Sequence, residues 1–389
     1  MTAKTLMVQG TGSGVGKSIL TAAICRYFYK SGVKVAPFKA QNMALNSFVT
    51  EKGDEMGRAQ AFQAEACGIS PDVLMNPILM KPSGDNSSQI ILMGKPSGSC
   101  NAKNYYALHK KHKKVVLSAL QSLREKYELV IIEGAGSPAE INLKKWDLVN
   151  MFIAEHSDSP VIIVGDIDRG GVFAWMKGTY DLLTLQEKKR VKGFIINKFR
   201  GDIELLVPGI KQFEELVPKP VLGVVPYEKN LVVDEEDSIS KWSYPTEPNA
   251  EGIINVAVIW TPRVSNFTDI SPLAYDPSVS LSYINHTSQL NKPDLIILLG
   301  SKNTIDDLIY LKEQKILEKV LKCHSDGSLI LGICGGFQML GNTIRDPKNL
   351  ESRISECAGL GLFDMDTTFA SNKLTRQIEL KTVKSRLFK

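Results

Sequence analysis

Cysteine is scarce in this chain of 389 residues, and its six cysteines show no CxxC spacing and no clustering with histidine. This argues against a disulfide framework and against a zinc site, and it predicts a reducing compartment, the cytoplasm. No apolar run approaches the roughly 18 residues that a membrane-spanning helix needs. The N-terminus also lacks the basic and apolar segments of a secretory signal, so the mature chain is expected to start at Met1.

Charge of one sign is lacking as well, with 47 Lys+Arg against 42 Asp+Glu and a formal net charge of +5. This balance gives nucleic-acid binding no support. Hydrophobic residues make up 43% of the chain, aromatic residues 7% and charged residues 23%, which is typical of a globular protein with a large core. At about 150 residues per domain, the length allows two or three domains.

Short apolar runs alternate with helical stretches over the first part of the chain. The runs are residues 5–9, 33–38, 129–133, 161–165, 193–197 and 222–225. Such alternation predicts an α/β domain with an open, mainly parallel sheet covered by helices on both faces. The helix between the first two runs is expected to bury one stripe, formed by Ile19, Leu20, Ala23, Ile24, Tyr27 and Phe28.

A second alternating series occupies residues 255–260, 294–300 and 328–334, and it predicts a second open α/β sheet. The acidic stretch between the two series has neither helical nor strand periodicity. The predicted organisation is an N-terminal domain over residues 1–226, a linker over 227–252 and a C-terminal domain over 253–389.

A glycine-rich segment, GTGSGVGKS, links the first apolar run to the following helix. In this context it predicts a P-loop, in which backbone N–H groups and a lysine surround phosphate oxygens. The expected phosphate-binding residues are Gly12, Gly14, Gly16 and Lys17. Ser18 is expected to offer its hydroxyl to Mg²⁺. Thr11 replaces the first glycine of the usual pattern, as in the loops of the dethiobiotin synthetase group, which this segment resembles.

Two polar residues end apolar runs that belong to the same predicted sheet. Glu133 occupies the position of a Walker B carboxylate, where it would hold Mg²⁺ directly or through water. A surface salt bridge is the alternative for Glu133. Asn197 is expected either to present its amide to an adenine ring or to make an ordinary turn.

Cys334 lies in another strand–turn–helix pattern. It follows an apolar run, has glycines on the side of the next helix, and matches a nucleophile elbow with sulfur in place of a serine hydroxyl. The N–H of Gly335 and the loop at Gly300 are expected to form an oxyanion hole. A buried cysteine without chemistry is the alternative.

These patterns and several longer blocks resemble the cobyric acid synthases, glutamine-hydrolysing amidotransferases of corrinoid biosynthesis. The blocks are residues 38–43, 56–60, 133–143, 166–173, 195–202, 265–269 and 300–304. The resemblance implies a P-loop synthetase domain and a class I glutamine amidotransferase domain. It implies an ATP- and Mg²⁺-dependent ligase that amidates the b, d, e and g carboxylates of adenosylcobyrinic acid a,c-diamide through acyl phosphates. Glutamine or ammonia would supply the nitrogen.

The resemblance also suggests roles for individual residues. Cys334 would attack glutamine, and Lys39 would neutralise the acceptor or the transferring phosphoryl group. Asp147, together with Glu140, either completes an acidic, metal-holding side or is a surface charge. The expected corrinoid contacts, with structural capping as the alternative, are Gln41, Asn42, Arg58 and Gln60.

One part of the family pattern is missing from this sequence. Class I glutamine amidotransferases pair the nucleophilic cysteine with a downstream histidine, and no histidine follows Cys334. The histidines present are His109, His112, His156, His286 and His324. The last of these is expected to lie on the surface of the preceding helix. We therefore predict a complete synthetase part, an incomplete glutaminase part, and amidation with free ammonia.

Three other interpretations stay open at this point. One is the sister enzyme cobyrinate diamide synthase, although residues 38–43 and 168–171 favour cobyric acid synthase. Another is a nucleotide switch of the partitioning-ATPase kind, although residues 11–15 lack the additional lysine of such loops. The third is a binding remnant without catalysis. Neither a nucleic acid nor a membrane is an expected partner, and a homo-oligomer is compatible with the sequence.

Overall fold

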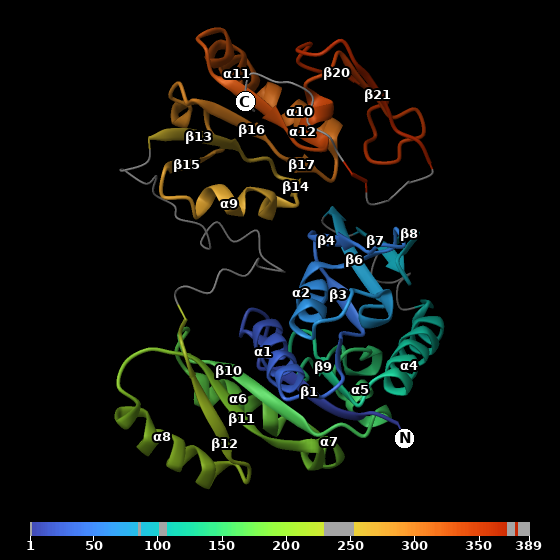
Figure 1. Cartoon of the computed structure of the whole chain (residues 1–389), viewed down its shortest axis with the longest axis vertical. Coiled ribbons are helices and arrows are strands. Elements are labelled where there is room, and N and C mark those ends of the chain that lie inside the picture. Colours follow the sequence, from blue (N-terminus) through green and yellow to red (C-terminus); the bar gives the residue numbers. More distant parts are fainter. Residues whose placement is uncertain (1, 85–86, 101–106, 229–252, 372–377, 380–389) are drawn as a thin grey trace. The chain divides into compact units, whose positions relative to one another are not determined.

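The computed structural model describes residues 2–84, 87–100, 107–228, 253–371 and 378–379 (Figure 1). They form two compact units, unit 1 with residues 2–228 and unit 2 with residues 253–371. Apart from residues 227 and 228, the predicted linker lies outside the described residues. Within the described residues, no helix combines the length and the apolar character needed to cross a membrane.

Unit 1 is built on a six-stranded sheet in the order β12-β11-β10-β1-β9-β2, and every neighbouring pair is parallel. The strands are β1 (Lys4–Gly10), β2 (Val35–Phe38), β9 (Leu129–Glu133), β10 (Val161–Asp166), β11 (Val191–Phe199) and β12 (Val221–Pro226). Each corresponds to one predicted apolar run. The predicted parallel α/β sheet is therefore confirmed.

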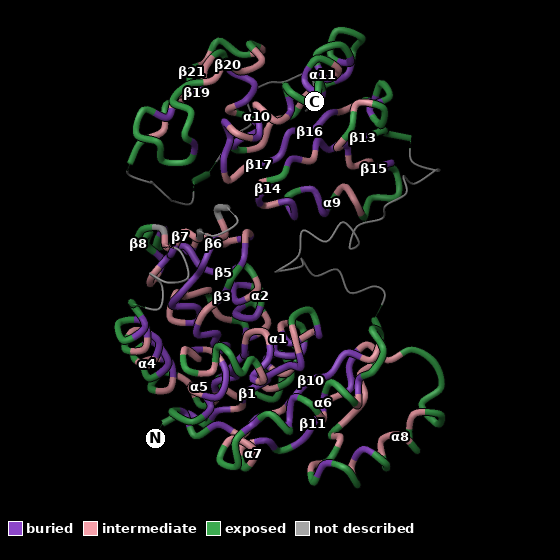
Figure 2. The backbone as a smooth tube through the Cα atoms, turned by 180° about the vertical axis from the view of Figure 1, so that it is seen from behind, coloured by how far each residue is buried: buried purple, intermediate pink, exposed green. Residues whose placement is uncertain are grey.

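Helices cover both faces of this sheet. They are α1 (Lys17–Lys30), α2 (Arg58–Ala66), α4 (His109–Lys126), α5 (Met151–His156), α6 (Val172–Asp181), α7 (Leu185–Arg190) and α8 (Ile203–Leu216). Successive residues of a strand point to opposite faces, so Met7 packs with α4, α5 and α6 while Val8 packs with α1. The inner strands are accordingly buried along most of their length (Figure 2).

The predicted buried stripe of α1 is wrong for half of its members. Ile19, Ala23 and Tyr27 are exposed. The helix instead buries Lys17, Leu20, Thr21, Ala22 and Cys25. The reason is that α1 packs against α2 as well as against the sheet. The hydrophobic periodicity of α1 does not reveal this second neighbour.

Between β2 and α4 the chain forms a second layer of strands that the sequence did not predict. A four-stranded sheet has the order β3-β6-β7-β8, and a separate antiparallel pair joins β4 to β5. Their bounds are β3 (Gln41–Met43), β4 (Ser47–Val49), β5 (Glu55–Gly57), β6 (Ile78–Gly84), β7 (Ser87–Leu92) and β8 (Lys95–Cys100). This layer carries residues of the two blocks 38–43 and 56–60.

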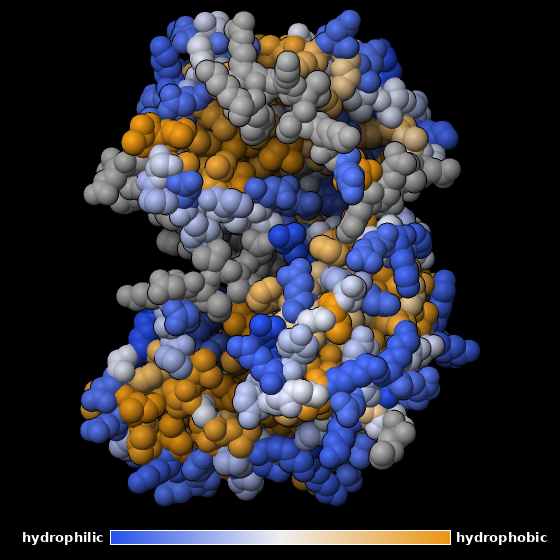
Figure 3. All heavy atoms as spheres, in the orientation of Figure 1, coloured by the Kyte–Doolittle hydropathy of each residue, from blue (hydrophilic) through white to orange (hydrophobic). Residues whose placement is uncertain are grey.

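The edge of unit 1 formed by α8 and β12 leaves apolar side chains exposed, as the hydropathy surface shows (Figure 3). Leu205 is 83% exposed, Leu216 65% and Leu222 52%. Phe213 is the buried residue of α8. Helix α8 therefore packs few of its side chains against the sheet.

Unit 2 contains a four-stranded parallel sheet in the order β15-β13-β16-β18. Its strands are β13 (Ile254–Ile259), β15 (Val279–Ile284), β16 (Leu295–Leu298) and β18 (Leu329–Gly332). One face packs against α10 (Thr304–Glu313) and α11 (Ile316–Ser325), so the predicted second α/β sheet is also confirmed. The other strands and α-helices described in unit 2 are β14 (Val264–Ser265), α9 (Ser271–Ala274), β17 (Gly300–Ser301), α12 (Gly335–Met339), β19 (Thr343–Arg345), β20 (Glu356–Ala358) and β21 (Asp366–Thr368).

Candidate functional site

The glycine-rich loop lies between the end of β1 and the start of α1, at the carboxyl edge of the parallel sheet. Gly14 and Gly16 have φ values of +72° and +95°, which residues with a side chain rarely adopt. A Cβ on Gly16 would also lie 2.2 Å from Nδ2 of Asn197. Glycine is therefore required at position 16 both by backbone conformation and by close approach.

Residues near the carboxyl ends of β10 and β11 hold this loop from one side. Nδ2 of Asn197 donates to the carbonyl of Val15 at 2.8 Å. Nζ of Lys198 donates to the carbonyl of Gly14 at 2.7 Å and to Oδ2 of the buried Asp166 at 2.9 Å. The predicted site residue Asn197 thus shapes the loop itself, and contact with a nucleotide base stays a prediction.

A cluster of charged and polar groups surrounds Glu133 at the end of β9. Its Oε1 accepts hydrogen bonds from Oγ of Ser18 at 2.8 Å and from Nζ of Lys39 at 3.0 Å. Its Oε2 accepts one from Nε2 of Gln63 at 2.6 Å. Lys17 is buried beside the loop, where its Nζ donates to the carbonyl of Gly12 at 2.7 Å. The structure therefore brings four segments of the chain together around one carboxylate.

The surroundings of Glu133 decide its charge. The side chain has no exposed surface, and burial alone would raise its pKa. The charge of Lys39, the hydrogen bonds from Gln63 and Ser18, and the charge of Lys17 act in the opposite direction and hold the pKa of Glu133 below its ordinary value. Glu133 is therefore an anion at neutral pH.

The oxygen atoms of this cluster fit Mg²⁺. A hydroxyl and a carboxylate are oxygen ligands of the kind Mg²⁺ prefers, and Mg²⁺ is usually held by one or two carboxylates together with phosphate oxygens. Ser18 and Glu133 are already within hydrogen-bonding distance of each other. The described residues contain no cluster of three or more His, Cys, Asp or Glu side chains suited to a metal. A metal site that shares its ligands with a nucleotide fits this arrangement better than an all-protein site.

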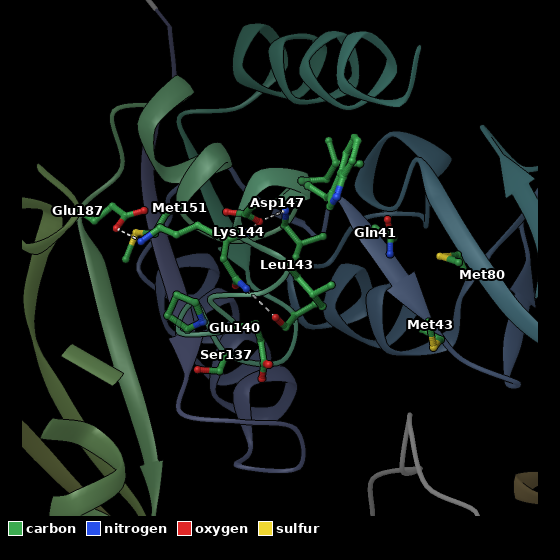
Figure 4. A pocket seen from close by; sticks show the side chains of 16 residues that line it. Gln41, Met43, Met80, Ser137, Glu140, Leu143, Lys144, Asp147, Met151 and Glu187 are labelled. Atoms are coloured by element: carbon green, nitrogen blue, oxygen red, sulfur yellow. Dashed lines mark hydrogen bonds and ion pairs between the residues drawn. The ribbon is translucent and has the colours of Figure 1, made fainter. Parts of the chain in front are cut away.

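A pocket of about 290 Å³ opens in unit 1 beside the loop that follows Glu133 (Figure 4). Apolar side chains such as Met43, Met80 and Leu143 line it together with polar ones such as Gln41 and Lys144. These come from β3, from β6 and from the segment that leads to α5. The pocket therefore combines the strand layer between β2 and α4 with the 133–143 block.

The four predicted corrinoid contacts separate into two groups. Gln41 lines the pocket, and Arg58 is exposed at the start of α2. Asn42 and Gln60 are buried, and Nδ2 of Asn42 donates to Oε1 of Gln60 at 3.1 Å. The structure therefore favours the structural alternative for this buried pair and leaves Gln41 and Arg58 accessible.

Asp147 and Glu140 both line the pocket, but Asp147 has a clear structural task. Its Oδ1 accepts hydrogen bonds from the N–H groups of Val149 and Asn150, and its Oδ2 accepts one from Phe152, each at 2.9 Å. The bond from Phe152 satisfies an N–H group in the first turn of α5, and the other two fix the segment that leads into the helix. Glu140 is exposed. A role in metal binding stays a prediction for both carboxylates.

Unit 2 presents Cys334 on a sharp turn between β18 and α12. Its backbone has φ +50° and ψ −110°, and the residue is exposed. A Cβ on Gly336 would lie 2.0 Å from the carbonyl oxygen of Leu298, which explains why a residue without a side chain follows the turn. This backbone is that of the predicted nucleophile elbow, in which strain holds the side chain outward. All six cysteines are free thiols.

The predicted oxyanion loop lies directly beside this turn. A Cβ on Gly300 would be 3.7 Å from Cβ of Cys334, and a Cβ on Gly335 would be 2.9 Å from the amide nitrogen of Ser301. Oγ of Ser301 donates to Oδ2 of Asp307 at 2.7 Å. Burial raises the pKa of Asp307, although hydrogen bonds from Ser301 and Arg263 act against it.

His324 lies on α11, and its Nδ1 is 2.9 Å from the carbonyl oxygen of Ser328. The residue is exposed, as expected from the sequence. Its ring is thus engaged with the backbone before β18.

Several residues around the two sites were missed by the sequence analysis: Gln63, Asp166, Lys198 and Asp307. Asp166 and Lys198 directly follow the apolar runs 161–165 and 193–197, so the argument that located Glu133 would have found them. Gln63 follows Gln60 by three residues in an alanine-rich helix, which was a weaker signal. The sequence contains no sign that distinguishes Asp307 from its neighbour Asp306.

Comparison with known proteins agrees with the description of unit 1 and of unit 2. Residues 6–239 match the model of the CobQ/CobB/MinD/ParA nucleotide binding domain, and residues 255–387 match the CobB/CobQ-like glutamine amidotransferase domain. Cobyric acid synthase of Alkaliphilus metalliredigens is 51% identical over 98% of this chain and 75% of its own length. That of Limosilactobacillus reuteri is 50% identical over 98% of this chain and 76% of its own length.

A solved structure of the signal recognition particle receptor FtsY from Elizabethkingia anophelis in complex with GDP aligns over 57% of this chain and 56% of that chain. The identity is 18% and the TM-score is 0.35, too low to support an inference. The family matches, in contrast, cover both units. The chain belongs to the cobyric acid synthase family, ATP-dependent amidotransferase ligases of cobalamin biosynthesis.

Proposed function

We propose that unit 1 activates peripheral carboxylates of a corrinoid acid with ATP. The acceptor is adenosylcobyrinic acid a,c-diamide, and the b, d, e and g carboxylates are amidated in turn. A carboxylate oxygen attacks the γ-phosphorus of ATP, ADP leaves, and an acyl phosphate forms. Ammonia then attacks the acyl carbon, and phosphate leaves with the carboxylate oxygen. The phosphoryl step makes a poor electrophile reactive by supplying a leaving group.

The observation that carries this proposal is the position of Lys39. It lies between β2 and β3, the strand whose Gln41 and Met43 line the pocket, and its Nζ bonds to Oε1 of Glu133 at 3.0 Å. A cation here can neutralise an anionic acceptor as it meets the γ-phosphate, while Lys17 serves the phosphates from the P-loop side. Bringing two anions together needs such charges because they otherwise repel each other.

Ser18 and Glu133 are the proposed Mg²⁺-holding residues. Bound there with the nucleotide, Mg²⁺ would offset negative charge on the phosphate oxygens. Ser18 contributes its hydroxyl from the first turn of α1, and Glu133 stays ionised because Lys39, Gln63 and Ser18 support its charge. Both residues are held at the ends of rigid elements, which limits their movement.

The pocket is the proposed position of the acceptor. Its apolar residues Met43, Met80 and Leu143 suit the hydrophobic faces of a large ring, and Gln41 and Lys144 can address its polar edge. Lys144 also bonds to Glu187 at 2.7 Å, so its ammonium group has a defined place on the wall. We propose that Arg58 and Gln41 contact acceptor carboxylates or amides.

In unit 2, Cys334 is proposed to attack the side-chain amide of glutamine, with N–H groups of Gly335 and the loop at Gly300 around the developing oxyanion. Glutamine or free ammonia is the proposed source of the nitrogen. Turnover measured with glutamine and with an ammonium salt compares the two sources.

The deciding experiment measures ADP release with ATP, Mg²⁺ and ammonium, in the presence and absence of the corrinoid acceptor. Mass spectrometry follows the stepwise conversion of carboxylates into amides. Acceptor-dependent hydrolysis with amide products supports the ligase. Hydrolysis that ignores the acceptor would indicate a nucleotide switch, and absence of hydrolysis a binding remnant.

A further inference from the structure

Gln63, which the sequence motifs do not include, lies inside the cluster around Glu133. It is on α2 and has no exposed surface. Its Nε2 donates to Oε2 of Glu133 at 2.6 Å and to the carbonyl of Ser18 at 3.2 Å. One amide group therefore touches both proposed Mg²⁺-holding residues, although it comes from a different helix.

The two oxygens of Glu133 have different partners. Oε1 is shared by Ser18 and Lys39, whereas Gln63 bonds to Oε2. Fixing both oxygens sets the plane of the carboxylate as well as its position. Because the glutamine amide is neutral, it stabilises the anion without adding a charge that would compete with a metal ion.

The carbonyl end of the Gln63 side chain gives independent evidence that this site takes up a ligand. Its Oε1 is buried and has no hydrogen-bond partner among the described residues. A buried acceptor without a donor is costly to fold around, so such atoms usually serve a ligand or a solvent molecule. Mg²⁺ bound in proteins keeps several of its waters, which are O–H donors.

We propose that Gln63 is a positioning residue that holds the Glu133 carboxylate in the orientation in which it and Ser18 take up Mg²⁺ with the nucleotide. This inference rests on the proposed function, since that assigns Mg²⁺ to Ser18 and Glu133. The contacts to Glu133 and to the Ser18 carbonyl also tie α2 to the first turn of α1. Gln63 thereby links the P-loop helix to the helix that begins at Arg58.

The test compares nucleotide affinity with and without Mg²⁺ in the full chain. Titration calorimetry gives the affinity for ADP in excess Mg²⁺ and again in excess EDTA. Gln63→Leu is expected to reduce the gain in affinity from Mg²⁺ by roughly 10- to 100-fold, the usual effect of losing a group that orients a metal ligand. Affinity for ADP in EDTA should change less than about twofold, because the P-loop contacts remain.

Gln60→Leu is the matched control. Gln60 is a glutamine on the same helix, is equally buried, and bonds to Asn42 rather than to Glu133. It removes a buried amide from α2 without touching the cluster, so it should leave the gain from Mg²⁺ unchanged. Gln63→Met, which has a more flexible side chain of similar length, repeats the test if the leucine variant fails to fold.

The possible results distinguish a failure of the role proposed for Gln63 from a failure of the Mg²⁺ assignment to Ser18 and Glu133. Equal loss of affinity in Mg²⁺ and in EDTA would mean that Gln63 only supports the fold, and an unchanged gain from Mg²⁺ would mean that it has no part in metal uptake. Either result overturns the proposal for Gln63 alone. If the unaltered protein gains nothing from Mg²⁺, the assignment of Mg²⁺ to Ser18 and Glu133 fails, and the role of Gln63 fails with it.

Discussion

The two units solve one structural problem in opposite ways. Each has a sharp turn from a parallel strand into a helix, at the P-loop in unit 1 and at Cys334 in unit 2. In the P-loop the positive φ angles belong to Gly14 and Gly16, and the turn offers its backbone. At the elbow the positive φ belongs to Cys334 itself, and the turn offers one side chain. In the P-loop the backbone N–H groups serve the function, and glycines adopt the positive φ angles. At the elbow the side chain serves the function, and the residue that carries this side chain adopts the positive φ itself.

A second contrast concerns two carboxylates without exposed surface, Glu133 in unit 1 and Asp307 in unit 2. Burial acts to raise the pKa of both. For Glu133 the opposing influences of Lys39, Gln63, Ser18 and Lys17 win, and the pKa falls below its ordinary value. For Asp307, whose cationic neighbour Arg263 is 3.3 Å away and itself partly exposed, burial wins and the pKa is raised.

The largest expected effect tests whether Lys17 of the P-loop acts on the transferring phosphoryl group. Lys17→Ala should lower acceptor-dependent ATP turnover by about 10²- to 10³-fold, because a positioned cation at the transferring phosphoryl group is lost. Steady-state ADP release at saturating ATP measures it. Lys198→Ala serves as the comparison, since Lys198 contacts the same loop through the carbonyl of Gly14. A Lys17 effect no larger than the Lys198 effect would contradict the proposed role.

The next effect tests whether glycine is needed in the P-loop turn. Gly16→Ala should destabilise unit 1 by about 2 kcal/mol or more, since it combines a strained φ with a Cβ placed 2.2 Å from Nδ2 of Asn197. Urea unfolding measures the change. Adding Asn197→Ala should recover part of the loss by removing the overlap. A double variant that is no more stable than Gly16→Ala would show that the strained backbone alone is responsible.

A smaller effect tests the backbone strain at Cys334. Glycine should be more stable than alanine at this position, which is the reverse of their order in a regular helix. In a regular helix Gly is about 0.5 to 1 kcal/mol less stable than Ala. At position 334 the positive φ favours glycine, so Cys334→Gly should be more stable than Cys334→Ala by about 1 kcal/mol. Hydrogen exchange of the β18–α12 segment compares the two. Equal or reversed stabilities would show that the turn is unstrained.

The smallest effect uses pH to separate the two carboxylates. The raised pKa of Asp307 means that its stabilising contribution is present below the ordinary value of 3.8 and is lost as pH rises through the folded value. The lowered pKa of Glu133 gives a contribution present above 4.5 and lost as pH falls. The stability of Asp307→Asn relative to the unaltered protein should therefore increase with pH, and that of Glu133→Gln should decrease. Urea midpoints between pH 3.5 and pH 7 measure both differences, and parallel trends would refute the contrast.

Much of the site could be predicted from local sequence because it lies where strands end. Glu133, Lys17 and Ser18 were placed by their position after an apolar run or within a glycine-rich loop, and the structure brings all three together. Asn42 and Gln60 show the limit of that reasoning. The family resemblance suggested either contact with a corrinoid or structural capping, and the structure buries both side chains against each other. Whether a polar side chain faces solvent or a neighbour depends on packing between segments distant in sequence.

The sequence by itself determined the two parallel sheets, the P-loop and the cysteine elbow. Apolar periodicity and the conformational freedom of glycine act over a few residues, and they leave a local trace. The tertiary structure alone decided that α1 buries Thr21 and Cys25 rather than Ile19 and Tyr27, and that Gln63 reaches Glu133 across 70 positions. Such contacts depend on how the helices pack against one another and against the sheet. That arrangement minimises the energy of the whole domain, so no short stretch of residues encodes it.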